Sequence, residues 1–441
     1  MSPREDARRI LDAAVAAADA AEAVRRSLRV DGGVLRAAGP DGADPREVDL
    51  AGVDGVWVVA AGKAAAQMAG AALEVLAGRV SGGTVTTRDG HGEPVPGLEH
   101  WEASHPVPDT RGLAGAADAL RVARGAGERD LLLVLLSGGA SALWPSPPPG
   151  VSLSDLRAVT ARLLRAGATI RELNAVRKHL SRIAGGWLAR AAFPARVVTL
   201  AVSDVVGSPL DVIASGPTVP DPTTFADALD VLARYEIDAS GPVRDYLREG
   251  AAGRRPETPK EGDAAFERAS THVVARNRDA LEGGAAAAER LGYRARVVAE
   301  DLEGEARAVA REIAALVRGP GPGGDDRRPL ALLLGGETTV TVRGRGRGGR
   351  NQELALALAL EIEGREDVVA AALGTDGSDG PTDAAGAIVD GGTVARGERL
   401  GLSAGDALAR NDSHTFLRAT GDLVVTGPTG TNVSDVVLLL R

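Results

Sequence analysis

Lysine, hydroxyl and acidic side chains follow short apolar runs along the chain, an arrangement that suits the transfer of a charged group. The first run, residues 56–61, is followed by Gly62 and Lys63 at the predicted start of a helix. Backbone amides and an ammonium group at one point suit an anion or a phosphoryl group in transfer. The motif is not a Walker A loop, because Ala64 stands where that loop has a hydroxyl residue. An exposed lysine without a role is the alternative interpretation.

Lysine is rare in this chain, which strengthens the interest of Lys63. Among the 51 basic residues, only Lys63, Lys178 and Lys260 are lysines. A lysine retained under such a bias indicates a position that needs a compact, titratable ammonium group. Lys260 lies in a loop that contains prolines, and we expect no function for it.

A second motif, SGGAS, follows the most apolar run of the chain, residues 131–136. Gly138 and Gly139 allow the backbone to approach a ligand closely, and Ser137 and Ser141 add hydroxyl donors. The alternative is an ordinary turn between a strand and a helix, which often uses two glycines.

Polar residues also gather in the predicted helix that begins near residue 170. Helical spacing brings Asn174, Arg177 and Lys178 to neighbouring turns, a set that fits a phosphate or a carboxylate. A solvated helix face explains the spacing equally well. His179, taken alone, is expected to be a surface or packed residue rather than a base.

The segment 202–224 contains four prolines directly after a buried run. Long, rigid loops at strand ends are more often functional than spacers. Asp204 is therefore a candidate Mg²⁺ ligand or general base. An aspartate that caps the following turn is the alternative.

The C-terminal half contains a literal G-x-G-x-x-G at Gly344, Gly346 and Gly349. We judge it weak evidence for a dinucleotide site, because the run before it alternates like a half-exposed strand and the next acid, Asp376, comes late. The interleaved arginines favour a polyphosphate or a carboxylate over a nicotinamide ring; they are Arg343, Arg345, Arg347 and Arg350.

A glycine-rich segment at 374–387 carries Asp376, Asp379 and Asp383. Carboxylates at a strand end suit Mg²⁺ and a nucleotide, but no glutamate stands at the twelfth position of an EF-hand loop. A surface turn rich in Gly and Asp is the alternative.

Six apolar runs must position these side chains. Runs of this kind predict strands buried on both faces, hence parallel strands between helical layers; they are 56–63, 131–141, 196–208, 330–339, 368–380 and 423–432. The fold class is therefore α/β, with ligands bound beyond the carboxyl ends of the strands. A helix is expected over 5–29. The polar segment 250–263 predicts a boundary that gives domains 1–250 and 251–441.

Composition narrows the functional class. The 441 residues carry a net charge of −9 and only 2% aromatic residues, which argues against nucleic-acid or anionic-membrane binding. The absence of cysteine excludes disulfides, thiolate zinc sites and cysteine nucleophiles. No apolar run approaches the roughly 20 residues that span a bilayer, and the N-terminus lacks a secretory apolar region. A soluble cytoplasmic enzyme is expected.

Taken together, these blocks resemble the glycerate 2-kinase family, whose C-terminal segment is of the MOFRL type. The resemblance rests on blocks in family order along nearly the whole chain: GKAAAQM, SHPVPD, SGGASAL, IRELNAVRKHLSRIAGG, SDVVGSPLDVIASGPTVPDP, GGRNQELALA, GTDGSDGPTDAAGA and TGPTGTNVSD. It implies a Rossmann-like N-terminal domain with a mostly parallel sheet, a smaller C-terminal α/β domain with a mixed sheet, and an active site in the cleft between them. It also implies transfer of the ATP γ-phosphoryl group to the 2-hydroxyl of D-glycerate, with Mg²⁺.

The family's lysine falls on Lys63 and its arginine on Arg350, which we expect to neutralise the phosphoryl group and to hold the glycerate carboxylate. Asp204 completes the expected catalytic set. Ser208 stands where the family usually has an acid, which weakens a metal role at that position. The expected binding residues are Gly62, Ser137, Gly138, Gly139, Ser141, Asn174, Arg177, Lys178, Gly336, Glu337, Asn351, Thr375 and Asp376, and the expected metal ligands are Asp204, Asp376 and Asp379.

Two other functions stay open. An NAD(P)H-dependent hydroxypyruvate reductase would use the glycine-rich loop for its dinucleotide. A non-catalytic sensor of a phosphorylated acid would keep the cationic sites without Mg²⁺ carboxylates. The sequence leaves the assembly open, a homodimer included.

Overall fold

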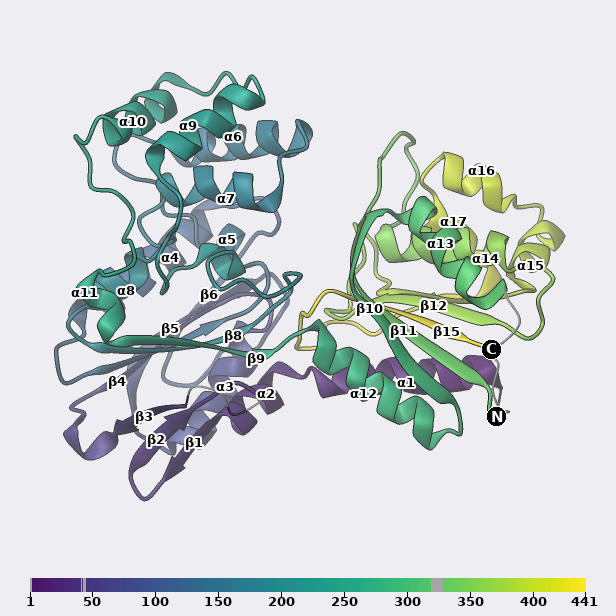
Figure 1. Ribbon diagram of the computed structural model, residues 1–441, viewed down its shortest axis with the longest axis horizontal. Coiled ribbons are helices and arrows are strands. Elements are labelled where there is room, and N and C mark those ends of the chain that lie inside the picture. The colour runs from purple at the N-terminus through teal and green to yellow at the C-terminus, as the bar shows by residue number, and fades with distance from the viewer. Residues whose placement is uncertain (1, 41, 43–44, 319–327) are drawn as a thin grey trace. The chain divides into compact units, whose positions relative to one another are not determined.

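The protein forms two compact units in the computed structural model, which describes residues 2–40, 42, 45–318 and 328–441. One unit is Ala20–Ala275, and the other combines Met1–Asp19 with Arg276–Arg441. Each unit is an α/β structure built around its own six-stranded sheet, as Figure 1 shows. No helix among the described residues is long and apolar enough to span a membrane.

All neighbouring strands of the large sheet in Ala20–Ala275 pair in parallel. Their order is β6-β5-β4-β7-β8-β9, the arrangement of a doubly wound dinucleotide-binding fold, and the winding reverses between β4 and β7. Every residue of β7 is buried, as expected of an apolar strand between two helical layers. The strands are β4 (Val56–Ala61), β5 (Val80–Arg88), β6 (Glu99–Ala103), β7 (Leu131–Leu136), β8 (Arg196–Val202) and β9 (Ala269–Ala275).

Helices cover both faces of this sheet, and a small antiparallel sheet adjoins it. Side chains of α4 and α8 pack with the strands in one apolar core, and α2 and α3 lie on the opposite face (Figure 1). These elements are α2 (Ala20–Ser27), α3 (Ala65–Leu76), α4 (Thr110–Gly125), α5 (Ala140–Leu143), α8 (Trp187–Ala192) and α11 (Ala264–Glu267), with β1 (Leu28–Asp31), β2 (Val34–Ala37), β3 (Arg46–Asp49) and the 3₁₀ turns Leu50–Gly52 and Ile213–Ser215.

Four further helices form a layer with a core of its own, which contains Leu173, Val176 and Phe225. Three of them begin with a capping box, such as Thr169 with Glu172, so the sequence itself fixes where they start. His179 packs edge-on against Phe225 at 4.7 Å between ring centroids and donates from Nε2 to the Glu257 carboxylate at 2.7 Å, which agrees with a packed histidine. The helices are α6 (Leu153–Arg165), α7 (Ile170–His179), α9 (Phe225–Arg234) and α10 (Gly241–Ala251).

The sheet of the second unit is mixed. Its order is β10-β11-β15-β12-β13-β14, in which β10 and β11 are parallel and every other pair is antiparallel. The C-terminal strand β15 therefore lies in the middle, between β11 and β12. The strands are β10 (Arg294–Glu305), β11 (Leu330–Thr339), β12 (Val369–Gly374), β13 (Gly386–Asp390), β14 (Leu423–Val424) and β15 (Asp435–Leu440).

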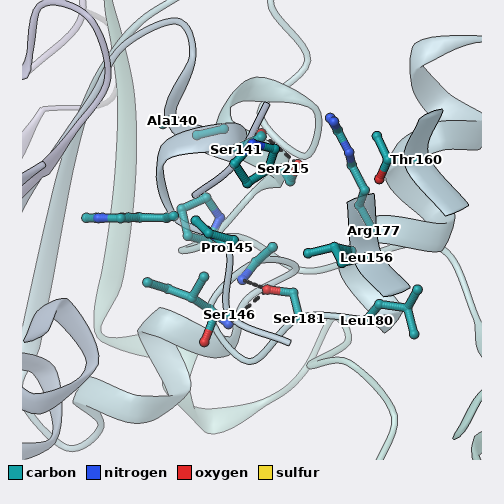
Figure 2. A pocket seen from close by; sticks show the side chains of 16 residues that line it. Ala140, Ser141, Pro145, Ser146, Leu156, Thr160, Arg177, Leu180, Ser181 and Ser215 are labelled. Atoms are coloured by element: carbon teal, nitrogen blue, oxygen red, sulfur yellow. Dashed lines mark hydrogen bonds between the residues drawn. The ribbon is translucent and has the colours of Figure 1, made fainter. Parts of the chain in front are cut away.

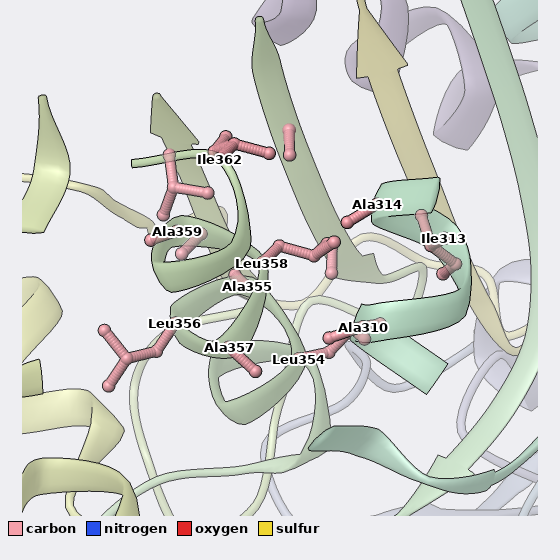
Figure 3. Close-up of a cluster of buried hydrophobic side chains, with 14 of the residues drawn as sticks. Ala310, Ile313, Ala314, Leu354, Ala355, Leu356, Ala357, Leu358, Ala359 and Ile362 are labelled. Carbon is pink, nitrogen blue, oxygen red and sulfur yellow. The ribbon is translucent and has the colours of Figure 1, made fainter. Parts of the chain in front are cut away.

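Helices α1 and α12 cover one face of the mixed sheet, and α13 to α17 lie on the other (Figure 1). Figure 3 shows the core between α13 and α14, where Ile313 and Ala310 face Leu354 and Leu358. The helices are α1 (Pro3–Ala17), α12 (Asn277–Arg290), α13 (Ala306–Arg318), α14 (Arg350–Glu361), α15 (Thr393–Arg399), α16 (Ala404–Ala409) and α17 (Ser413–Thr420).

The α/β class is confirmed, and five of the six apolar runs contain the predicted strands. The run 423–432 contributes the two-residue strand β14, and the residues of the helix expected over 5–29 form α1 and α2, which belong to different units, and the start of β1. The apolar runs 330–339 and 368–380 form strands buried on both faces, but their neighbour β15 is antiparallel to both, so burial did not require parallel pairing. The units also differ from the expected ranges 1–250 and 251–441. Strand β9 pairs with β8 of the first sheet, and α1 packs on α12 of the second unit.

Candidate active site

The carboxyl ends of β4 and β7 lie side by side at the switch point of the parallel sheet, where such folds bind ligands. The two loops are bonded together: Lys63 donates its amide to the Gly138 carbonyl at 3.0 Å, and the Ala64 amide donates to Ser137 Oγ at 3.0 Å. Gly62 has φ +130°, and a Cβ there would lie 2.1 Å from Ser137 Oγ. Glycine is therefore required where the two loops meet.

Gly139 extends this contact to a histidine that the sequence analysis did not single out. Its φ is +90°, and a Cβ at Gly139 would lie 3.1 Å from His105 Cδ2 and 3.5 Å from Lys63 Cγ. His105 thus lies beside Lys63, two residues beyond the end of β6. Its place in the SHPVPD block, directly after a strand, was the available signal.

A chain of hydrogen bonds leads from this loop to α7. Ser141 Oγ lies 2.8 Å from Ser215 Oγ, Ser215 donates to Asn174 Oδ1 at 3.1 Å, and Asn174 donates to the Val212 carbonyl at 3.4 Å. Asn174 is 2% exposed, so it positions Ser215 rather than meeting a ligand itself.

Lys178, expected among the binding residues, is enclosed in the fold. Its Nζ donates to Asp211 at 3.2 Å and to Asp221 at 3.3 Å, and the residue is 1% exposed. Burial opposes ionisation of Asp221, but the Lys178 charge and the Thr223 hydrogen bonds hold the pKa of that carboxyl below its usual value. Lys178 therefore ties α7 to the 203–224 segment, which is a positioning role.

Arg177, the neighbour of Lys178, lines a small pocket instead (Figure 2). The pocket lies between α5, α6, α7 and the 3₁₀ turn Ile213–Ser215, and Ser141 and Ser215 line it too. Burial lowers the pKa of Arg177 to about 10, so its guanidinium stays charged at neutral pH. The pair Asn174 and Arg177 shares one helix, but only the arginine reaches the pocket lining.

Asp204 follows β8, the neighbour of β7, and is partly buried. Ser203 before it bonds to the Ala275 carbonyl through its amide and accepts from the Val205 amide, which fixes the turn. Ser208 has φ +49°, within the same loop. Asp204 thus stands at the strand-end edge where the sequence analysis expected it.

In the second unit, Arg350 begins α14 and is held by two carboxylates. Its Nε and Nη2 donate to Asp435 at 2.6 and 3.0 Å, and Nη1 donates to Glu337. Burial by itself would lower the pKa of Arg350, but the Asp435 charge and hydrogen bonds raise it above its ordinary value. The expected residues Arg350 and Glu337 are therefore brought together, with Asp435 as a partner that the sequence analysis did not name.

The glycine-rich loop before α14 is a packing device. A Cβ at Gly344 would lie 2.0 Å from the Arg410 carbonyl, and one at Gly346 would lie 2.4 Å from Asp412 Cβ. A Cβ at Gly349 would lie 2.3 Å from the Asp379 carboxyl carbon. The three glycines of the G-x-G-x-x-G pattern are thus required by contacts within the unit, not by a pyrophosphate.

Asp379, expected as a metal ligand, caps α14. Its carboxylate accepts from the Asn351 amide at 3.1 Å, the Gln352 amide at 2.9 Å and Gln352 Nε2 at 2.9 Å. Burial raises the pKa of Asp379 to about 6 despite these bonds. Its oxygens are engaged by helix donors, which argues for a capping role.

Three other expected binding residues of this unit also serve its loops. Asp376 accepts from the Ser378 amide at 2.9 Å, and Thr375 donates to the Ser434 carbonyl at 2.6 Å. Gly336 has φ +143°, and a Cβ there would lie 2.3 Å from the Leu302 amide nitrogen. Among the residues that the structure describes, no three His, Asp or Glu side chains cluster as a metal site.

Comparison with known proteins places this geometry in a family. Residues 6–248 match a family described as a domain of unknown function (DUF4147), and residues 330–435 match the MOFRL family. A D-glycerate 2-kinase from Thermotoga maritima is 42% identical over 92% of this chain and 95% of its own. A crystal structure of a glycerate kinase from that organism has a TM-score of 0.83 at 39% identity and covers 99% of both chains. The chain belongs to the glycerate 2-kinase family.

Two relatives carry a different name. A protein from Agrobacterium vitis, named only provisionally as a hydroxypyruvate reductase, is 44% identical over 100% of this chain and 95% of its own. Within the glycerate 2-kinase family, the glycine-rich loop that first suggested a dinucleotide is explained by packing. The expected site residues of this chain form two groups. One lies at the strand ends around Lys63, and the other lies around Arg350.

Proposed function

We propose that the protein is an ATP-dependent glycerate 2-kinase, which transfers the γ-phosphoryl group of ATP to the 2-hydroxyl of D-glycerate and yields 2-phosphoglycerate and ADP. The observation that carries the proposal is the place of Lys63: a scarce lysine at the switch point of a parallel sheet, on a loop bonded to a second glycine-rich loop. The D-glycerate 2-kinase that is 42% identical over nearly the full length supports the choice of acceptor.

In this reaction the glycerate hydroxyl oxygen bonds to the γ-phosphorus while the bond to the bridging oxygen of ADP breaks. Such a transfer depends on positioning and on neutralisation of charge rather than on covalent catalysis. Lys63 supplies positive charge at the strand ends of the first unit. In the second unit, Asp435 orients the Arg350 guanidinium through two hydrogen bonds. Asp204 is a candidate for either of two roles: it receives the hydroxyl proton, or it holds the divalent cation.

The donor set at the strand ends fits a divalent cation of the kind kinases use. Mg²⁺ is usually held by one or two carboxylates, with phosphate oxygens and water completing its shell. Asp204, on the fixed turn after β8, is the carboxylate that would hold it, since Asp379 is engaged at the start of α14. The ion would offset charge on the phosphates of the nucleotide.

Reduction of hydroxypyruvate is not our proposal, because each glycine of the G-x-G-x-x-G pattern meets a protein atom within 2.5 Å of its Cβ position. The pattern therefore has a cause that involves no dinucleotide.

The test is release of ADP from ATP and Mg²⁺ that depends on D-glycerate, with phosphorus NMR to assign the 2-phosphate. Lys63→Met should lower kcat/KM by about 10²-fold or more, as expected for loss of a group that stabilises transition-state charge. Oxidation of NADH with hydroxypyruvate is measured beside it and should stay silent.

Lys260→Met is the matched control, since Lys260 bonds to Thr258 in its own loop and to the Thr223 carbonyl, 37 residues earlier in the chain. It should lower the melting temperature and leave kcat/KM close to that of the wild type. Glycerate-independent ADP release, or a Lys63→Met enzyme of full activity with glycerate, would refute the proposal.

A further inference from the structure

A pocket beside the Lys63 loop contains a cation without a counter-charge. Arg177 is one of its 16 lining residues, none of which is an aspartate or a glutamate. Across the described residues of the chain, the Arg177 side chain makes no hydrogen bond and no ion pair. Figure 2 shows its side chain extending along the pocket from α7, on the same side as Ser141 and Ser215.

Such an arginine costs folding free energy. Burial alone lowers the pKa of Arg177 to about 10, with no carboxylate to oppose it. Arg177 is partly exposed, and a cation that loses part of its hydration without gaining a partner lowers the stability of the folded state. Its neighbour Lys178, also on α7, is fully buried but is held by two carboxylates. The charge of Lys178 is therefore balanced within the fold, whereas the charge of Arg177 is not.

The hydroxyls next to Arg177 are arranged as donors. Ser215 gives its proton to Asn174 Oδ1 at 3.1 Å, so in the contact of 2.8 Å between the two hydroxyls Ser141 is the donor. The Ser141 proton can turn into the pocket, while Ser215 stays fixed by Asn174. An acceptor group in the pocket would thus meet a guanidinium fork and a hydroxyl.

The backbone at the pocket is strained, and the space is small. Ala214 and Ser215, both in its lining, have φ of 51° and 60°, a conformation that non-glycine residues keep only when the surroundings enforce it. The cavity is about 30 Å³, room for about two or three waters, which suits a group of the size of a carboxylate.

We propose that this pocket binds the carboxylate of the acceptor 2-hydroxy acid, with Arg177 as a bidentate donor and Ser141 as a second donor. The inference rests on the proposed glycerate kinase activity and assigns it a substrate-binding residue. Ser141 follows Gly139, beside which Lys63 lies, so an acid held by its carboxylate here stays next to the phosphoryl-binding loop. Arg350 already bonds to two carboxylates and is less available for a third.

The test measures binding of D-glycerate and of its neutral analogue D-glyceramide by calorimetry, with wild-type protein and Arg177→Gln. The variant should weaken glycerate binding by about tenfold to a hundredfold, the range for a charged hydrogen bond, while glyceramide and ATP bind as before. The melting temperature should stay level or rise, because an unpaired and partly buried charge has been removed.

Arg171→Gln is the matched control, since Arg171 lies on the same helix and is exposed; it should leave all three affinities unchanged. If Arg177→Gln does not fold, Arg177→Lys keeps the charge, loses the bidentate fork and should bind glycerate with an intermediate affinity. A preference for glycerate over glyceramide that Arg177→Gln leaves undiminished overturns the proposal, as does an undiminished preference in Arg177→Lys or a wild type that shows no such preference.

The two proposals fail separately. A wild type that binds glycerate through Arg177 and releases no ADP removes the kinase and leaves the carboxylate pocket. A wild type that phosphorylates glycerate with the same KM after Arg177→Gln removes the pocket and leaves the kinase.

Discussion

The start of α14 and the strand ends around Lys63 differ in whether an arginine there is paired with carboxylates. At α14, Arg350 bonds to Asp435 and Glu337, and Asp379 accepts three hydrogen bonds from the helix start. Near Lys63, the fold leaves the Arg177 guanidinium without a bonded partner in the described chain. The charged groups named at α14 are therefore paired, although Asn351 Oδ1 is buried there without a hydrogen-bond partner, whereas the arginine of the second region is an unpaired cation.

This difference distinguishes an arginine that is held by the fold from an arginine that is available to bind a ligand. An arginine with two carboxylates is held in one orientation at little net cost, because its partners offset the desolvation of its charge. An arginine without a partner lowers stability until an anion arrives. Such a balance, in which stability is exchanged for binding, is common at functional sites.

Glycine substitutions give the largest expected effect and test the comparison directly. Gly62→Ala would place a Cβ 2.1 Å from Ser137 Oγ at φ +130°, and we expect a loss of at least about 3 kcal/mol from backbone strain and steric overlap. In any folded fraction the KM for ATP should rise, because the β4 and β7 loops separate. Urea unfolding with steady-state kinetics provides both measurements.

Gly346→Ala is the paired variant in the other region, where a Cβ would lie 2.4 Å from Asp412 Cβ. It should also lower stability, but the KM for ATP of the folded enzyme should not change. If Gly346→Ala raises the KM for ATP as strongly as Gly62→Ala does, the glycine-rich loop binds nucleotide and the contrast between the two regions is wrong.

Asp435→Asn is expected to have the next largest effect. It leaves one acceptor for Arg350 and adds an amide donor that faces the guanidinium, so two charged hydrogen bonds are reduced to one. We expect a loss of about 2 kcal/mol in unfolding free energy and a fall in kcat of about tenfold, because Arg350 is no longer held in place.

Glu337→Gln is the control for Asp435→Asn, since the Glu337 side chain is 49% exposed and that of Asp435 is 4% exposed. Its effect on unfolding should stay within about 1 kcal/mol. Equal losses for the two variants would show that Arg350 is oriented by the surface carboxylate as much as by the buried one.

Local patterns predicted the strands, because an apolar run and a glycine-rich end are both local. They also located Lys63, Ser141 and Arg350. They did not predict the partner of a charged side chain: Asp435 lies 85 residues after Arg350, and nothing in the spacing of Asn174, Arg177 and Lys178 separates a buried ion pair from a pocket cation.

The unit boundary and the roles of the acidic loop were not predictable for a related reason. Strand β9 lies beyond the polar segment that looked like a linker, and only pairing with β8 assigns it to the first sheet. Asp379 stands in a loop whose composition suits a metal, and only its distance to the Asn351 and Gln352 amides reveals a helix cap. Long-range contacts decide such cases.

Titration of Asp379, which caps the start of α14, gives the smallest expected effect. The pKa of the Asp379 carboxyl is about 6 in the folded protein and 3.8 in the unfolded chain. The folded state therefore binds the proton more tightly than the unfolded state. The contribution of this carboxyl to stability is complete below pH 3.8 and is lost as the pH rises through 6, by at most about 3 kcal/mol. Asp435, Arg350 and the α14 amides face this carboxyl and remain in the variant.

Asp379→Asn removes the titration. Urea unfolding between pH 4.5 and 7.5 should therefore show a difference between wild type and variant that shrinks steadily as the pH rises, while groups common to both cancel. A constant difference would mean that Asp379 keeps an ordinary pKa and that the start of α14 is open to water, as a metal or nucleotide site would be. In that case the contrast with the Arg177 pocket would weaken, because both regions would present unmet polar groups to a ligand.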